Sequence, residues 1–201
     1  MEMKTHAYAG LLVAQGTLIY FQQPAISLVT PIAFVTGYLL GPAADIDKPE
    51  SFVGSKLWPI SNALSMLKVG HRTLTHSIVF VALLWVALTL LPVPVVLVWV
   101  ATLAYASHPS IDLLNEQGVQ LFWPLPFRIK LLPDLIAIPV DSPGEGVIRL
   151  LLMIGVIGGF FIYLYTIIQP FPIIGAAFRY IVDLLPDQME TIIKSLSERI
   201  N

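Results

Sequence analysis

The chain has 201 residues, of which 56% are apolar and only 12% are charged, and its mean hydropathy is +0.80. Because soluble domains carry about 25% charged residues, this composition argues against a soluble protein and predicts an integral membrane protein. The formal net charge of -2 offers no basic surface for phosphate contacts, which excludes nucleic-acid binding. The absence of cysteine excludes disulfides and thiolate ligands, so any metal needs nitrogen and oxygen donors.

Apolar segments predict an all-α fold, a polytopic membrane helical bundle of about five spans (four to five). Residues 7–20 are the weakest segment and are predicted as a span or half-span, and the chain before them lacks the pattern of a cleaved signal. Residues 25–44 contain no charge. Within them, Gly37 and Gly41 have the small-xxx-small spacing that lets two helices approach closely.

Two longer apolar stretches predict the second half of the bundle. Residues 77–106 exceed the length of one span, but Pro92 and Pro94 divide them into a tight helical hairpin. Residues 147–168 are the clearest span. Residues 1–170 are therefore expected to form a transmembrane domain that carries the site.

The C-terminal segment, residues 171–201, has a different pattern. Its apolar residues recur on one helical face with charges between them. This spacing is typical either of an amphipathic helix lying in the membrane interface or of an ordinary packed tail.

Five spans place both long loops, residues 45–73 and 108–146, on the same side of the membrane as the N-terminus. Most lysine and arginine residues fall on that side, so the positive-inside rule predicts that it is cytoplasmic. The second loop contains the aromatic and proline-rich residues 121–133. Trp123 and Phe127, beside basic residues, are typical there of an anchor at headgroup level.

The same topology brings four histidines and three aspartates to one membrane face. No histidine occurs elsewhere in the sequence. Ionisable groups at a membrane rim are costly unless they are paired or functional, so one shared site explains the grouping better than seven separate interfacial residues. The predicted metal ligands are His6, Asp45, Asp47, His71, His76, His108 and Asp112.

The first two motifs of this group are DIDKP and GHRTLTHS. Prolines flank DIDKP and favour extended backbone, in which Asp45 and Asp47 point the same way and suit a divalent cation. GHRTLTHS is expected to place His71 in the loop and His76 in the first turn of the next helix. The alternatives are a solvated polar loop for the aspartates and ordinary interfacial residues for the histidines.

In the third motif, SHPSID, His108 and Asp112 have the i,i+4 spacing that puts two ligands on one helix face. Pro109 is tolerated in the first turn of a helix and not in its interior, which predicts a new helix beginning at Ser107 or His108. A helix cap with a polar helix end is the alternative interpretation.

Seven nitrogen and oxygen ligands exceed the needs of one tetrahedral zinc with an open position and suit two divalent ions bridged by a carboxylate. Zn²⁺ is the first expectation, and Mn²⁺, Mg²⁺ or Fe²⁺ are compatible. Such a centre activates a bound water for phosphoester hydrolysis. Asp47 is a predicted base, Arg72 a predicted phosphate-binding residue and Glu116 a predicted acid/base group. Arg72 also fits the positive-inside pattern, and Glu116 an ordinary loop.

The ordered segments MKTHAYAG, GPAADIDKPESFVGSKL, GHRTLTHS and SHPSIDLLNEQGVQLFWPLPFR resemble the YdjM family of bacterial inner-membrane proteins, which are described as membrane-bound metal-dependent hydrolases. The resemblance covers residues 3–130. It implies metal binding by the seven residues named above and a multi-pass protein of the bacterial plasma membrane. The order of the motifs is also distantly similar to that of zinc-dependent phospholipase C and P1-nuclease proteins.

Two positions depart from the family pattern. The usual Leu-Pro-Asp-Ile-Asp-His-Pro here has Ala44 in place of the proline and Lys48 in place of the histidine, so position 48 is not a ligand. Pro109 and Ser110 replace the apolar residues that are common after the third histidine. No proposed ligand is lost.

The preferred interpretation is a membrane-embedded hydrolase that cleaves a phosphoester of a lipid or another membrane-associated substrate, with membrane lipids and that substrate as partners. One alternative is a transporter or ion channel that uses the ligands as a transit site, although no ionisable residue lies in the middle of a predicted span. The other alternative is a structural or partner-binding membrane protein, which would bind no metal.

Overall fold

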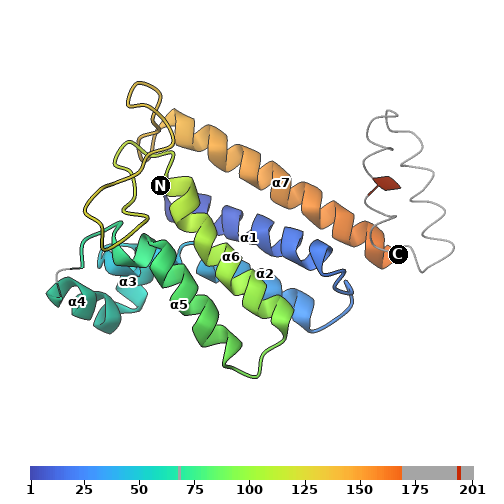
Figure 1. The fold of residues 1–201 in the computed structure, drawn as a ribbon. Coiled ribbons are helices and arrows are strands. Elements are labelled where there is room, and N and C mark those ends of the chain that lie inside the picture. Colours follow the sequence, from blue (N-terminus) through green and yellow to red (C-terminus); the bar gives the residue numbers. More distant parts are fainter. Residues whose placement is uncertain (68, 169–193, 196–201) are drawn as a thin grey trace.

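The computed structural model describes residues 1–67, 69–168 and 194–195, and every regular element in these ranges is a helix (Figure 1). The all-α prediction is therefore confirmed. The described loops add only isolated bridges, such as the one between Val119 and Ile129. The amphipathic segment predicted for residues 171–201 lies outside the described residues, apart from 194–195.

The long helices form a bundle in which consecutive members run in opposite directions, so α1 and α7 run in the same direction, and each member corresponds to a predicted span (Figure 1). The central helix α1 contacts three of the others, and α5 packs on α6 (Figure 1). The predicted span 25–44 is shorter than expected, because residues 25–28 form a bend in which the Thr30 hydroxyl donates to the Pro24 carbonyl at 2.9 Å. The helices are α1 (Met3–Tyr20), α2 (Val29–Leu40), α5 (Ile78–Thr89), α6 (Val95–Asp112) and α7 (Pro143–Ile168).

Short helices occupy the region expected to be a loop, residues 45–73. Ser51 caps one of them by accepting a hydrogen bond from the Gly54 amide at 2.8 Å. These helices are too short to contain a long apolar run, so the sequence pattern did not predict them. These elements are η1 (Ala43–Asp47), α3 (Phe52–Lys56), α4 (Trp58–Met66) and η2 (Leu74–His76).

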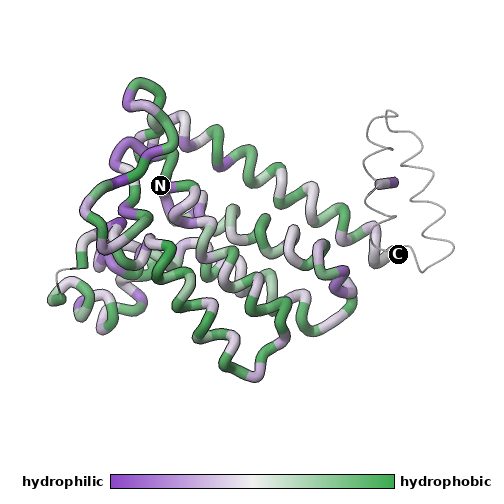
Figure 2. Tube along the Cα trace, viewed as in Figure 1, coloured by the Kyte–Doolittle hydropathy of each residue, from purple (hydrophilic) through white to green (hydrophobic). Residues whose placement is uncertain are grey.

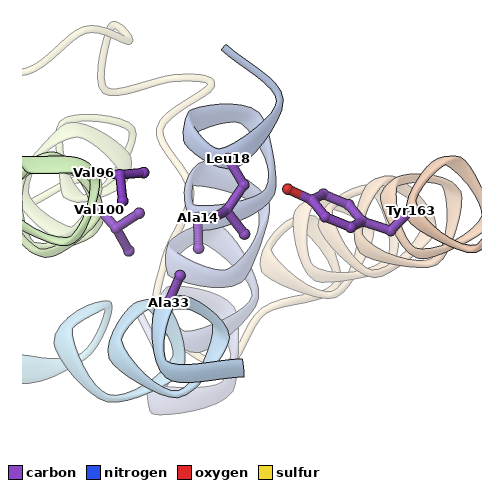
Figure 3. Packing of buried hydrophobic residues seen from close by; sticks show 6 residues of the cluster. All are labelled: Ala14, Leu18, Ala33, Val96, Val100 and Tyr163. Atoms are coloured by element: carbon purple, nitrogen blue, oxygen red, sulfur yellow. The ribbon is translucent and has the colours of Figure 1, made fainter. Parts of the chain in front are cut away.

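Small residues bring α1 and α2 together, as their spacing predicted. A Cβ atom on Gly37 would lie only 2.5 Å from the Gly10 carbonyl oxygen and 2.7 Å from Ala14 Cβ, so the two backbones touch directly. A Cβ on Gly41 would collide with the His6 carbonyl. Farther along α1, buried residues of four helices form the apolar core shown in Figure 3, namely Ala14, Leu18, Ala33, Val96, Val100 and Tyr163.

Among the described helices, the segment Pro143–Thr166 of α7, with a mean hydropathy of 2.3, is the one long and apolar enough to cross a membrane. Helices α2 and α5 are apolar, but their 12 residues extend only about 18 Å. Hydrophilic residues gather at the end of the bundle that carries the N-terminus and the loops (Figure 2). The five-span topology and the cytoplasmic side of this end remain predictions.

Candidate metal centre

The bundle gathers all seven predicted ligands at its loop-bearing end. Five side chains are buried, and those of Asp45 and His71 are partly exposed. They come from four separate parts of the chain: His6 from the start of α1, Asp45 and Asp47 from η1, His71 and His76 from the turn before α5, and His108 and Asp112 from the end of α6.

Four donor atoms converge at the centre of this group. His108 Nε2 lies 3.4 Å from Asp45 Oδ1 and 3.8 Å from Asp112 Oδ2, while His76 Nε2 lies 3.7 and 3.8 Å from the same two oxygens. Nitrogen and oxygen ligands at tetrahedral zinc bond lengths are separated by about 3.3–3.6 Å. The four atoms are therefore spaced as metal ligands are, and too far apart for short hydrogen bonds.

These atoms also lack the partners that buried polar groups require. His76 Nε2, His108 Nε2 and Asp112 Oδ2 have no hydrogen-bond partner, and neither do both ring nitrogens of His6. An unsatisfied buried polar atom costs about 1–3 kcal/mol, so several in one place need an explanation. A divalent cation satisfies the His76, His108 and Asp112 atoms together, and the residues present fit such an ion.

Asp47 holds the histidines instead of facing the centre. Its Oδ1 contacts His71 Nδ1 at 2.8 Å, and its Oδ2 accepts from the Thr75 hydroxyl at 2.5 Å and lies 3.3 Å from His76 Nδ1. The expectation of extended backbone with two parallel aspartates was wrong, because η1 is a 3₁₀ turn, in which residues two apart diverge. Asp45 therefore faces the centre, while Asp47 orients the rings around it.

His108 is oriented by a backbone group that carries no sequence signal. Its Nδ1 lies 2.9 Å from the Gly41 carbonyl oxygen, which leaves Nε2 directed at the centre. His6 stacks on His108 with ring centroids 3.5 Å apart, and its Nε2 lies 3.4 Å from Asp112 Oδ1. The glycine contact between α1 and α2 therefore also assembles this side of the site.

Two local predictions about the histidine helices need correction. Helix α6 is continuous from Val95 to Asp112 with Pro109 inside it, so no new helix begins at Ser107 or His108. Pro109 has no N–H to donate to the carbonyl four residues earlier, so the helix continues through this position with one hydrogen bond fewer, and the i,i+4 relation is kept. His76 ends η2 and precedes α5, whose cap is the Ser77 hydroxyl.

Arg72 is buried and paired within the protein. Its Nε lies 2.9 Å from Asp112 Oδ2 without the alignment of a hydrogen bond, and its Nη1 donates to Asn115 Oδ1 at 2.6 Å. It adopts a left-handed φ of 62°, which is uncommon for a residue with a side chain. Asn115 was not singled out as an arginine partner, although its position one turn after Asp112 is the signal for it. Glu116 points to solvent, and its acid/base role remains a prediction.

The η1 and η2 groups have shifted pKa values. Burial raises the pKa of the Asp45 and Asp47 carboxyls, but contacts with His108 for the first and His71 for the second outweigh burial and hold both well below their usual range. Burial lowers the pKa of His76, but its contacts with Asp45 and Asp47 prevail and raise it to about 9. Without an ion, the centre is therefore a network of carboxylates and a protonated imidazole.

A pocket of about 610 Å³ leads to this centre. Asp45, His71 and Arg72 line it together with residues from the N-terminus, from the region between η1 and α3, and from the second loop. The centre is thus accessible to a small ligand from the loop-bearing end.

The fold and the site together define a class of protein: a helical bundle of membrane-protein composition with a histidine–aspartate centre at one end. The chain belongs to the YdjM inner membrane protein family, whose model matches residues 1–171. Membership supports a location in the bacterial inner membrane.

Two curated relatives share the family name. Inner membrane protein YdjM of Escherichia coli (strain K12) is 36% identical over 123 residues, which are 59% of this chain and 57% of the relative, and the Shigella flexneri protein of that name has the same values. The chain thus spans little more than half the length of these relatives. Uncharacterized protein YvsG of Bacillus subtilis (strain 168) is 26% identical over 132 residues, 65% of this chain and 78% of the relative. No solved structure matches, and the similarity to phospholipase C and P1 nuclease is not shown.

Proposed function

We propose that this protein is a metal-dependent hydrolase of the inner membrane, which cleaves a phosphoester of a lipid or another membrane-associated substrate. The observation that carries the proposal is the convergence of His76 Nε2, His108 Nε2, Asp45 Oδ1 and Asp112 Oδ2 at 3.4–3.8 Å, with three of the four atoms lacking a hydrogen-bond partner. Such atoms are not needed for folding and are suited to an ion.

The donor set indicates the kind of ion. Imidazole nitrogens and carboxylate oxygens without thiolates suit Zn²⁺, Mn²⁺ or Fe²⁺, and the predominance of histidine favours Zn²⁺ over Mg²⁺. When bound, such an ion lowers the pKa of a water molecule and stabilises negative charge on a phosphoryl oxygen. The remaining work falls to the protein's own residues.

Those residues have distinct tasks in the proposed site. Asp47 is the hydrogen-bond partner of His71 Nδ1, and the Thr75 hydroxyl, which donates to Asp47, accepts from His76 Nδ1, so that these contacts favour the tautomers with Nε2 unprotonated. Arg72 stays beside Asp112 and provides positive charge near the inner end of the pocket. His71 is one-third exposed and lines the pocket, so it is placed to exchange a proton with a bound substrate.

The test compares the metal content of the wild type with that of an Asp45→Asn, His108→Ala variant, both purified in detergent and measured by mass spectrometry. An Asp134→Asn variant is the matched control, because Asp134 is exposed and pairs only with Lys130. We expect stoichiometric metal in the wild type and the control and its loss in the double variant. Hydrolysis of nitrophenyl phosphate monoesters and diesters should follow metal content.

Two results would refute the proposal. Absence of metal from the wild type after reconstitution with each divalent ion would remove the metal centre and favour a structural or partner-binding protein. Bound metal without hydrolysis of any phosphoester would remove the enzymatic reaction and favour a transport site.

A further inference from the structure

The outer wall of the 610 Å³ pocket has a composition that the metal centre does not explain. Beyond Asp45 and Arg72 at its inner end, the pocket is lined by Lys4 and Lys48, and by the aromatic ring of Phe52. None of these three residues belongs to the metal centre. Their side chains are exposed, so the pocket passes from carboxylates and histidines to basic and then apolar groups.

The two lysines have no acidic partner among the described residues. Two other basic residues near this end are paired with carboxylates, Lys130 with Asp134 and Arg149 with Glu2. Glu2 also lines the pocket, but Arg149 already occupies its carboxylate. The two free ammonium groups therefore make the mouth of the pocket electropositive and suited to an anion.

The backbone around Lys48 is fixed close to the metal centre. Its amide donates to the Asp45 carbonyl at 3.1 Å, and its own carbonyl accepts from the Ser51 amide at 2.9 Å. A Cβ atom on Gly54 would collide with the Lys48 carbonyl, so α3 packs directly against this residue. Lys48 therefore extends from a rigid turn that also holds Asp45.

The third component is an apolar surface beside the lysines. Phe52 is 54% exposed, and it is followed by exposed Leu57 (45%), which joins α3 to α4, and by Trp58 (63%) and Ile60 (52%) of α4. Side chains of this kind next to a basic pocket are typical of the region where lipid headgroups meet acyl chains. A ligand that matches the whole surface has an anionic head and an apolar chain.

We infer that the pocket binds the phosphate-bearing head of an amphiphile whose head carries net negative charge, with Lys4 and Lys48 contacting the phosphate and Phe52 contacting the start of its apolar chain. Binding of this ligand does not depend on the proposed function, whereas its hydrolysis at the inner end of the pocket does. It makes the two lysines specificity-determining residues, which act on binding and not on the chemistry. The same phosphate group occurs in a lipid and in a soluble ester, and the two sources differ in their need for Phe52.

The experiment measures binding to the full chain in detergent by calorimetry, with chelator-treated and with metal-loaded protein. The probes are glycerol 3-phosphate, dihexanoyl phosphatidic acid, and dihexanoyl phosphatidylcholine, which lacks a phosphate monoester. A Lys4→Gln, Lys48→Gln variant should bind both monoesters roughly tenfold more weakly in both metal states, since each exposed ionic contact contributes up to about 1 kcal/mol. A Phe52→Ser variant should lose roughly threefold to fivefold for phosphatidic acid only.

Matched controls make the result decisive. Lys56→Gln removes the same charge from α3, outside the pocket, and should leave both affinities unchanged, while Lys48→Arg should retain binding. Equal losses for Lys56→Gln and Lys48→Gln, or unchanged binding in the double lysine variant, would overturn the assignment. Equal affinity for phosphatidylcholine would overturn it as well. Lysine-dependent binding without hydrolysis would refute only the proposed function.

Discussion

Replacing Asp47 by asparagine tests whether this residue binds the metal itself or only orients the histidines that bind it. Asp47 contacts His71 Nδ1 at 2.8 Å and His76 Nδ1 at 3.3 Å, so its charge acts on both rings, and the Nε2 atom of His76 lies at the centre. Loss of such an orienting carboxylate typically lowers metal affinity by about 10–100-fold, which is roughly 1.4–2.7 kcal/mol. We therefore expect Asp47→Asn to weaken metal binding within this range and to keep the stoichiometry.

The assay is competition with a chromophoric chelator, run beside Asp45→Asn. Because Asp45 Oδ1 lies at the centre, its replacement should remove the ion that it binds and so lower the metal stoichiometry. Circular dichroism and thermal unfolding establish that both variants are folded. Unchanged affinity in Asp47→Asn, or a fall in stoichiometry equal to that in Asp45→Asn, would refute the assignment of Asp47 as an orienting residue.

Three further predictions concern packing, docking of the last helix and pH. Gly41→Ala should lower the free energy of unfolding by about 1–3 kcal/mol, because the new Cβ would collide with the His6 carbonyl. Gly16→Ala, where a Cβ has nothing within 4 Å, should leave that free energy unchanged, and thermal unfolding compares the two variants. Glu145 accepts hydrogen bonds from the Glu2 amide and the Thr5 hydroxyl, so Glu145→Gln should cost about 1–3 kcal/mol and increase proteolysis of the junction before α7. Burial lowers the pKa of His76, but contacts with Asp45 and Asp47 raise it to about 9, and the ring must lose its proton to bind metal. Metal affinity should therefore rise roughly tenfold per pH unit up to about pH 9. Chelator competition at pH 6 and pH 8 measures this rise, and an unchanged metal affinity would show that His76 is not a ligand.

The helix positions were largely predictable because each long helix contains an apolar run, although Gln15 interrupts that of α1. The spacing of Gly37 and Gly41 also predicted a close helix contact, and the structure identifies Gly10 of α1 as the partner of Gly37. The short helices α3 and α4 were not, because five and nine residues are too few for periodicity to stand out and because Pro59 reads as a breaker. Their stability comes from packing against η1, which the sequence does not display.

The gathering of the seven residues was predictable from topology, whereas their directions were not. Whether Asp45 and Asp47 point together or apart depends on a few backbone dihedrals, and the 3₁₀ turn of η1 divides them between the centre and its surroundings. The continuity of α6 through Pro109 goes against the local preference of proline, so the residue type alone predicted a break that the structure does not have. Gly41 acts through a carbonyl oxygen, which every residue possesses, so no side-chain pattern could reveal it.

The arrangement also bears on the number of ions. Two separate groups are each spaced to hold one ion, His6 with His108 and Asp112, and Asp45 with His71 and His76, and the ligand atoms of each group lie within 4.8 Å of one another. A single ion at the middle would leave both ring nitrogens of buried His6 without a partner, whereas a second ion binds one of them and lowers this cost.

We therefore expect two ions per chain. His6→Ala and His71→Ala should each reduce the metal content from two to one, because each histidine belongs to only one group. Quantification of metal against protein by mass spectrometry provides the measurement. One ion in the wild type and one in both variants would instead place a single ion among the four central atoms, and His6 would then act on the site only through its stacking against His108.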